Sequence, residues 1–443
     1  MQNTSFTAGM TKKASALIRD NKLIILVSSI FIGWKFFLVS VFFNNEFSRS
    51  EESLIYIGHI DSVNRCSYIV FCDQFLQSFK TYYGFALLSY RVLFGAIGHL
   101  LNMNSSNVFH LSFYIGILML LPALIFFLKN IETDKRLIAF LLFFLTLYNG
   151  GGSHGFWWVA PDFFASLIAF IAYAIILGDY KHWKMILAIL MPVGFYFHTI
   201  FVYLMSTIVI FYFFYSFSTK NIHVVMLKKI VFSILILLIF YIPTSYYLGG
   251  NPYGPETFVL KSNIVNSGIQ SLEKNISPAP SENSSSQSKS ERRYSARHLF
   301  PGFNKIKERY FDYIFFEYNP FFIMIFAGVI LILFHYKQYK ILSMYFAALV
   351  FTLASSLNQH ADRALPFIWP ITFLLYGYGV WFAFQLSEEY LKENRKIKIA
   401  FNTFLYSGMV IFIVINIIYS YGVNQNIEFN PAKFLEDYVW NHR

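Results

Sequence analysis

The sequence predicts an all-α membrane protein: a polytopic helix bundle of about eleven transmembrane helices, with amphipathic interfacial helices in the first outer loop. Three observations predict this class. Of 443 residues, 56% are hydrophobic and 13% are charged, whereas soluble chains carry roughly 25% charged residues. Apolar runs of about the length that crosses a bilayer recur along the chain. Lys and Arg gather in alternate connections between these runs.

The apolar runs define the individual spans. A span needs about 20 residues, and the runs 136–149 and 185–198 are shorter than that. The stretch 184–218 has 35 residues and is interpreted as two spans, because Pro192 and Gly194 permit a break there. The predicted spans are 22–44, 107–128, 136–149, 157–178, 185–198, 199–218, 229–248, 314–335, 340–356, 366–386 and 398–420.

Basic residues distinguish the two sides of this bundle. The segments assigned to the cytoplasm hold 18 Lys and Arg residues, and the short outer segments hold 3. This asymmetry follows the positive-inside rule, so we expect the N-terminus in the cytoplasm and the C-terminus in the periplasm. The inner segments are 1–22, 129–136, 179–184, 219–229, 336–340 and 387–398, and the short outer ones are 149–157, 198–199, 356–365 and 421–443.

The stretch 82–101 is apolar, but we expect it to lie along the outer interface. It carries Arg91 and His99, and a crossing would turn every later basic loop outward. The second outer loop contains a serine-rich linker at 281–290, whose six serines in ten residues cannot bury a core. The domains are a cytoplasmic N-terminus at 1–21, a transmembrane module at 22–247 with the first outer loop 44–106, an outer loop at 248–313, C-terminal transmembrane helices at 314–420 and an outer tail at 421–443.

Charge and cysteine content bear on other classes of protein. The net charge of +11 is explained by loop orientation, and no run of interleaved basic and aromatic residues indicates nucleic-acid binding. The two cysteines, Cys66 and Cys72, have no further ligands at metal-binding spacing. They fall in an outer loop, where a disulfide can persist, so a local disulfide and two free thiols both remain open.

The first outer loop begins with acidic residues. Glu51 and Glu52 follow a span closely and precede an apolar turn, so a carboxylate at the interface can serve as a general base toward an acceptor hydroxyl. The same two residues suit a helix N-terminus, with Ser50 as the cap and both carboxylates in the first turn. Glu46 and Asp61 are further carboxylates of this loop.

Glycine and tryptophan residues mark the outer loop at 149–162. Its four glycines let the backbone approach a ligand closely, and His154 and Trp157 belong to the same loop. The tryptophans equally fit an interfacial belt. Asp162 stands just inside the outer end of a span, where a carboxylate normally has a partner or a function.

Further polar residues occur on the predicted outer side. The island 358–366 contains His360 and Arg363, whose guanidinium fork suits phosphate, although a solvated ion pair with its neighbour explains it equally well. His198 stands at the outer junction of two spans, either as a hydrogen-bonded structural residue or as a ligand contact. Lys35, within the first span, either snorkels to the interface or pairs inside the bundle.

These motifs, in this order, resemble the GT-C class of membrane glycosyltransferases, which use polyprenyl-phosphate-linked sugars on the non-cytoplasmic face. That class opens its first outer loop with an acidic pair, usually Asp-Glu, followed by a short apolar turn with Tyr and then by interfacial helices. The similarity covers the architecture from residue 22 to about 386. The matching stretches are Glu51-Glu52-Ser53-Leu54-Ile55-Tyr56, Tyr83-Gly84-Phe85, Leu93-Phe94-Gly95, Pro161-Asp162, His198-Thr199, and Arg363-Ala364-Leu365-Pro366 with Pro370.

The resemblance implies an inverting transfer of a sugar from a polyprenyl-phosphate donor to a glycan or lipid-linked acceptor. One carboxylate of the acidic pair deprotonates the acceptor hydroxyl, and Asp162 orients the acceptor or assists the base. Arg363, with a histidine, neutralises the lipid-phosphate leaving group. It implies no nucleotide; a divalent metal stays open, although the sequence does not indicate one, and no other cofactor is expected. The implied catalytic residues are Glu51, Glu52 and Asp162, and the implied substrate-binding residues are Arg363, His360, His198, His154 and Trp157.

The chain departs from the pattern of this class at two positions. Glu51 stands where Asp is usual, and Ala364 stands where an aromatic residue often follows the arginine. The choice of base therefore stays open among the carboxylates Glu51, Glu52, Glu46 and Asp61.

Two rival functions also stay open. An O-antigen-type glycan polymerase or ligase has a large outer loop with several arginines, although the acidic first loop argues against it. A membrane transporter or lipid flippase would carry midplane charges and broken helices in paired halves, and the sequence shows no such pairing. Abundant Lys, Ile, Asn, Phe and Tyr fit a bacterial surface-polysaccharide enzyme of the inner membrane. The arginines that keep the polymerase open are Arg292, Arg293, Arg297 and Arg309.

Overall fold

A computed structural model describes residues 21–43, 57, 60, 61, 63, 64, 88–147, 161–198, 200–247, 306, 307, 311, 320–355 and 365–424. All regular elements within these ranges are helices, and each of the eleven predicted spans overlaps one of them. The helices are α2 (Lys22–Phe43), α6 (Leu88–Leu101), α7 (Ser105–Ile131), α8 (Lys135–Leu147), α9 (Pro161–Leu177), α10 (Trp183–Phe197), α11 (Ile200–Thr219), α12 (Val224–Tyr247), α17 (Pro320–His335), α18 (Tyr339–Ser355), α19 (Leu365–Tyr390) and α20 (Arg395–Asn424).

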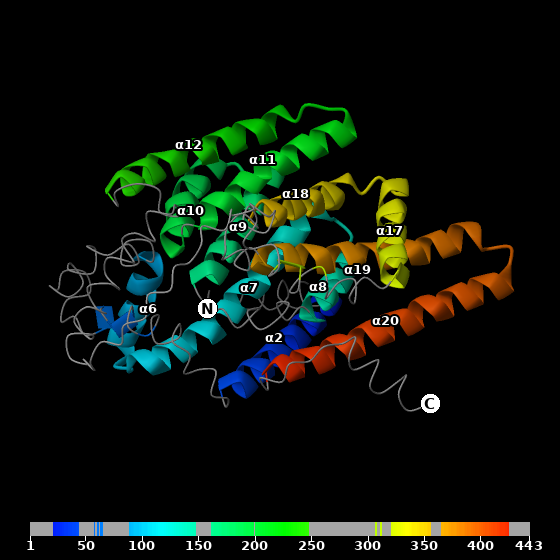
Figure 1. Cartoon of the computed structure of the whole chain (residues 1–443), viewed down its shortest axis with the longest axis horizontal. Coiled ribbons are helices and arrows are strands. Elements are labelled where there is room, and N and C mark those ends of the chain that lie inside the picture. Colours follow the sequence, from blue (N-terminus) through cyan, green and yellow to red (C-terminus); the bar gives the residue numbers. More distant parts are fainter. Residues whose placement is uncertain are drawn as a thin grey trace, which may run out of the picture.

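Most of these helices lie side by side in one bundle (Figure 1). Helix α7 packs on α9, α2 packs on α8, and α18 packs on both α11 and α19. The short connections between α11 and α12 and between α19 and α20 lie toward the same end of the bundle, on the right of Figure 1, whereas α6 lies at the opposite end. The connections at the right carry Lys220 and Lys392, so these two of the basic segments expected on one side do share one end.

The described part of the chain is that of a helical membrane protein. Six helices contain a stretch long and apolar enough to cross a bilayer. The helices α8, α9, α10, α17 and α18 are shorter; the 15 residues of α10, for example, extend about 23 Å at 1.5 Å per residue. The break predicted at 198–199 is confirmed, because α10 ends at Phe197 and α11 begins at Ile200. The six stretches are Lys22–Ser40, Ser105–Ile131, Ile200–Thr219, Val224–Thr244, Phe367–Tyr390 and Arg395–Val414.

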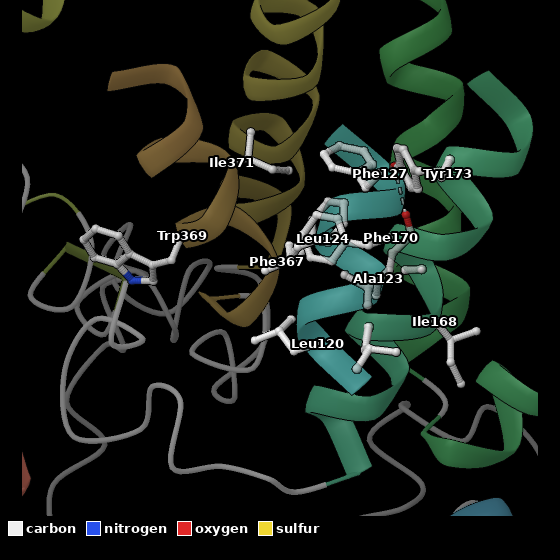
Figure 2. Packing of buried hydrophobic residues seen from close by; sticks show 14 of the residues in the cluster. Leu120, Ala123, Leu124, Phe127, Ile168, Phe170, Tyr173, Phe367, Trp369 and Ile371 are labelled. Atoms are coloured by element: carbon white, nitrogen blue, oxygen red, sulfur yellow. Dashed lines mark hydrogen bonds between the residues drawn. The ribbon is translucent and has the colours of Figure 1, made fainter. Parts of the chain in front are cut away.

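Aromatic side chains fill the core where α7, α9 and α19 meet. Figure 2 shows Phe127 of α7, Phe170 and Tyr173 of α9 and Phe367 of α19 gathered there. The ring centroids of Phe127 and Phe170 are 5.3 Å apart, and those of Phe170 and Phe367 are also 5.3 Å apart. The buried Tyr173 hydroxyl forms a hydrogen bond with Thr207, as a buried phenol requires. Close packing of this kind holds helices together in lipid, where apolar burial alone provides little driving force.

Lys229 is a buried cation at the basic end of the bundle. Its Nζ donates hydrogen bonds to the carbonyl oxygens of Ile175, at 3.2 Å, and of Gly178. These carbonyls belong to the last turn of α9 and the residue after it, where the helix leaves acceptors unsatisfied and carries the negative end of its dipole. The backbone of α9 therefore stabilises this ammonium group.

Three helices end in a residue with a left-handed backbone that is not glycine: Asn102 (φ 50°), Lys220 (φ 52°) and Lys337 (φ 54°). In each case, the next residue donates its N–H to a carbonyl five positions earlier; the N–H of Asn221, for example, reaches the oxygen of Ser216 at 3.2 Å. This pattern closes the helix and satisfies one of its terminal carbonyls. The left-handed conformation costs roughly 1 kcal/mol for a residue with a Cβ.

Helix α17 crosses the direction of its neighbours and packs on α19 at a glycine (Figure 1). A Cβ added to Gly379 would lie 2.6 Å from Cγ1 of Val329 and 3.1 Å from its Cβ. We therefore expect Gly379→Ala to lower the free energy of unfolding by about 1–3 kcal/mol, because the two helices must separate. Thermal unfolding of the purified chain in detergent micelles measures this change.

Gly328→Ala is the matched control, because an added Cβ at this neighbouring position meets no atom within 4 Å. We expect its unfolding temperature to equal that of the wild type or to exceed it slightly, since Ala favours the helix. Equal melting of the two variants would contradict close packing at Gly379.

Candidate functional site

The candidate site is the end of the bundle that carries α6, opposite the short basic connections (Figure 1). Two of the predicted site residues fall within the described ranges: His198 with its side chain, and Asp162 with its backbone alone. The alternative base Asp61 is also described. The others lie outside the described residues, and their roles stay predictions: Glu51, Glu52, His154, Trp157, His360 and Arg363, together with Glu46, Cys66 and Cys72.

Helix α6 rests on the ends of α9 and α10 through four rings, here named the aromatic junction: Tyr90, Phe94, Phe164 and Phe197. Phe164, near the start of α9, lies 5.3 Å from Phe94 and 6.1 Å from Tyr90, measured between ring centroids. Phe164 also stacks on Phe197, the last residue of α10, at 5.3 Å. Ser89 adds a hydrogen bond of 3.2 Å from its Oγ to a carbonyl oxygen of α10. These contacts fix α6 against the bundle end.

The aromatic junction brings two predicted site residues to one corner of the bundle. Asp162 is the second residue of α9 and precedes Phe164 by two positions. His198 directly follows Phe197. Because Phe164 and Phe197 stack, the backbones of Asp162 and His198 start from neighbouring places beside α6. Pro161 begins α9, where its fixed φ and missing N–H suit the first helical position.

His198 connects α10 to α11 through its backbone and its ring. Its backbone N–H donates to the oxygen of Gly194 at 3.3 Å, which closes α10. Its ring Nδ1 accepts the backbone N–H of Ile200 at 3.1 Å, and its side chain is buried. This bond satisfies one of the free N–H groups at the start of α11, as a capping side chain does. The hydrogen bond from Ile200 therefore supports the interpretation of His198 as a structural residue. Its contact with substrate stays a prediction.

Asp61 ties the first outer loop to the start of α7. The Ser105 hydroxyl donates to Oδ1 of Asp61 at 2.8 Å. Asn64 donates from Nδ2 to the oxygen of Met103 at 2.8 Å and to Oγ of Ser105 at 3.2 Å. A carboxylate beside the first residue of α7 also faces the positive end of that helix. Asp61 thus has a structural role at the start of α7, and the choice of base among the four carboxylates stays a prediction.

Glycines on α6 receive this same loop. A Cβ on Gly95 would lie 2.4 Å from Cβ of Val63, and one on Gly98 would lie 2.9 Å from Cγ of Asn64. The spacing of three residues places both glycines on one face of α6. The loop therefore packs directly on the backbone of α6, which joins the residues around Asp61 to the aromatic junction.

Two buried cations, one on α6 and one in the interior of α2, were not assigned to the site from the sequence. Arg91 of α6 and Lys35 of α2 are fully buried, and both helices pack on α7. Burial lowers the pKa of the Arg91 guanidinium to about 10, which leaves it charged at neutral pH. Lys35 Nζ lies 5.7 Å from the ring centroid of Phe31. Buried charges at membrane depth commonly mark the path or the site of an ionic substrate. In the sequence, each of these cations is a lone charge within an apolar stretch. For Arg91, that charge also argues against a span.

A cavity elsewhere in the described ranges holds none of the predicted site residues. It lies at the basic end, between α17, α19 and α20. Among the described residues, no group of three or more His, Cys, Asp and Glu side chains is placed to hold a metal ion.

The capping role of His198 can be measured directly. We expect His198→Ala to lower the free energy of unfolding by about 0.5–2 kcal/mol, because α11 loses its capping acceptor, and His198→Asn to retain most of it. His182→Ala is the control, since His182 occupies the position before α10 without a side-chain capping bond. Equal melting temperatures for His198→Ala and His182→Ala would show that the ring of His198 does not stabilise the junction.

Comparison with known proteins adds no relative to this picture. No family model, no curated protein and no solved structure matches the chain. The resemblance to the GT-C class therefore rests on the motifs and their order along the sequence.

Proposed function

We propose that the chain is an integral membrane glycosyltransferase of the GT-C type. It moves a sugar from a polyprenyl-phosphate donor to a glycan or lipid-linked acceptor on the non-cytoplasmic face of a bacterial inner membrane. The observation that carries the proposal is the position of α6. This helix lies at the bundle end opposite the basic connections and contacts the start of α9, which carries Asp162 (Figure 1).

The proposed topology has eleven spans, a cytoplasmic N-terminus and a periplasmic C-terminus. Support comes from the basic connections at one end of the bundle, because positive loops stay in the cytoplasm. The 14 residues of α6 extend about 21 Å, less than the hydrocarbon thickness of about 30 Å. With α6 at the interface, the acidic loop, the glycine-tryptophan loop and the arginine island share the outer side.

The proposed reaction is an inverting displacement at the anomeric carbon. The acceptor oxygen attacks that carbon while Glu51 or Glu52 takes the hydroxyl proton, and the bond from the carbon to the phosphate oxygen breaks. The electron pair leaves with the polyprenyl phosphate, whose charge Arg363 and His360 or His198 stabilise. Asp162 orients the acceptor. The buried Arg91 is a further cation at this end of the bundle. The prenyl tail stays in lipid while the phosphate reaches the loops.

The helices that contain proline are continuous, which favours an enzyme over a transporter. Transporters place their sites at interrupted helices near the midplane. Pro122 of α7, Pro192 of α10, Pro243 of α12 and Pro370 of α19 all lie inside helices that continue through them.

The acidic pair is tested by sugar transfer with the purified protein and a polyprenyl-phosphate sugar. If one of the two carboxylates is the base, Glu51→Gln or Glu52→Gln should lower the transfer rate about 10²–10⁴-fold, and Asp162→Asn and Arg363→Ala should also lower it. Glu393→Gln, at an exposed position of the opposite end, is the control. Wild-type rates in both folded glutamine variants would exclude this base. Passage of substrate across vesicles without a new glycosidic bond would favour a transporter.

The topology is tested by labelling single cysteines. In a Cys66→Ser/Cys72→Ser background, we expect a membrane-impermeant maleimide to label Ser285→Cys in intact spheroplasts. Lys181→Cys, at an exposed position between α9 and α10, should react only after the membrane is permeabilised. The reverse pattern would mean that the stretch 82–101 crosses the bilayer, and the shared outer side of the motifs would be lost.

A further inference from the structure

A cavity of about 490 Å³ opens between α17, α19 and α20 at the basic end of the bundle, away from α6. Its volume falls within the range of about 300–1,000 Å³ that is usual for ligand sites. Its wall is almost wholly apolar and aromatic. The lining includes His335 of α17, Leu386, Ser387 and Tyr390 of α19, and Ile397 and Phe401 of α20.

One polar group in this apolar wall lacks a partner. Ser387 is fully buried, and its Oγ has no hydrogen-bond partner among the described residues. A serine within a helix commonly donates to the carbonyl one turn earlier, as Thr372 of the same helix does at 2.9 Å. A buried hydroxyl without a partner costs about 1–3 kcal/mol. This hydroxyl lies behind the apolar wall, where the structure leaves it without surface toward the cavity.

Two basic residues, here named the rim, directly precede the lining residue Ile397 of α20 in the sequence. Arg395 and Lys396 begin α20, are exposed, and form no ion pair within the described ranges. Cations in a first helical turn face the positive end of the helix dipole, which is unfavourable unless an anion is present. Lys398 of the same turn has its anion, since its Nζ lies 2.6 Å from Oε2 of Glu388.

Of the carboxylates near the start of α20, Glu393 is exposed, whereas Glu388 and Glu389 are engaged with other side chains. Glu388 is paired with Lys398, and Glu389 accepts a hydrogen bond from the Tyr336 hydroxyl at 2.9 Å. This bond also ties α17 to α19, and His335 lies beside Tyr390 with their ring centroids 5.9 Å apart. These contacts join the end of α17 to α19 beside the cavity.

The cavity faces the lipid side of the bundle. None of the described side chains of α20 is buried, and Ile397 and Tyr390 on the cavity wall are 52% and 64% exposed. In a membrane protein, such surfaces contact acyl chains. An apolar cavity with a basic rim, at the level where the short basic connections lie, has the chemistry of a binding site for an anionic lipid of the same leaflet.

We propose that the cavity between α17, α19 and α20 binds an anionic phospholipid. One acyl chain fills the apolar cavity, and the phosphate lies against Arg395 and Lys396. This site is separate from the proposed sugar-transfer site and does not depend on that activity.

Thermal unfolding of the delipidated full chain in dodecyl maltoside micelles tests this. Phosphatidylglycerol should raise the unfolding temperature more than phosphatidylcholine, and inorganic phosphate should not raise it. The Arg395→Gln/Lys396→Gln variant should raise the phosphatidylglycerol concentration for half-maximal effect by about tenfold or more. Ile397→Trp, which fills the cavity, should abolish the preference for phosphatidylglycerol.

Matched controls come from other exposed positions. Lys181→Gln/Lys228→Gln removes two exposed charges, one between α9 and α10 and one in the second turn of α12. Ile399→Trp adds the same bulk at a position with 55% exposure that does not line the cavity. Both should respond to phosphatidylglycerol as the wild type does. Equal responses in the rim, cavity and control variants would overturn the proposal. So would an equal effect of phosphatidylcholine, or an equal effect of inorganic phosphate.

Discussion

The contact of α6 with the start of α9 and the end of α10 is the constraint on which the assignment of every later loop to one side depends. The tilted contact of Phe164 with Phe94 and its stacking on Phe197 give α6 a position at the bundle end, so its buried Arg91 need not enter the hydrocarbon. A crossing here would reverse the side of every later loop. The same contact places the start of α9 and the end of α10 beside the first outer loop, which Asp61 and Ser105 fasten to α7.

Much of the fold could be predicted from the sequence, because in lipid a spanning backbone must satisfy its own hydrogen bonds and apolar runs therefore become helices. Each predicted run overlaps a helix, and the break expected within 184–218 occurs after Phe197, although α10 continues through Pro192 and Gly194. The ends were harder to predict. Lys220 and Lys337 occupy left-handed positions where glycine is usual, so nothing local marks those turns.

The candidate site was predictable only in part, for a different reason. Side-chain partners separated by many residues, such as Asp61 and Ser105, carry no periodic signal in one sequence. The ring of His198 could be weighed as cap or ligand, but only its bond to Ile200 gives it the capping role. Arg91 stood out as a charge in an apolar stretch, yet its complete burial depends on how α6 sits against its neighbours. The cavity beside α20 depends on three helices and has no sequence motif.

The uneven burial of charge and of apolar surface also bears on biogenesis. The apolar stretch of α20, whose described side chains are all at least partly exposed, can leave the insertion machinery and dissolve in lipid by itself. Helix α2 differs, because Lys35 is fully buried and would meet hydrocarbon until neighbouring helices surround it. Lys229 of α12 likewise needs the carbonyls of α9, which is synthesised earlier and is already present. The carbonyl acceptors of α9 are thus synthesised before the ammonium group of Lys229. Lys35 of α2, in contrast, is synthesised before the helices that bury it.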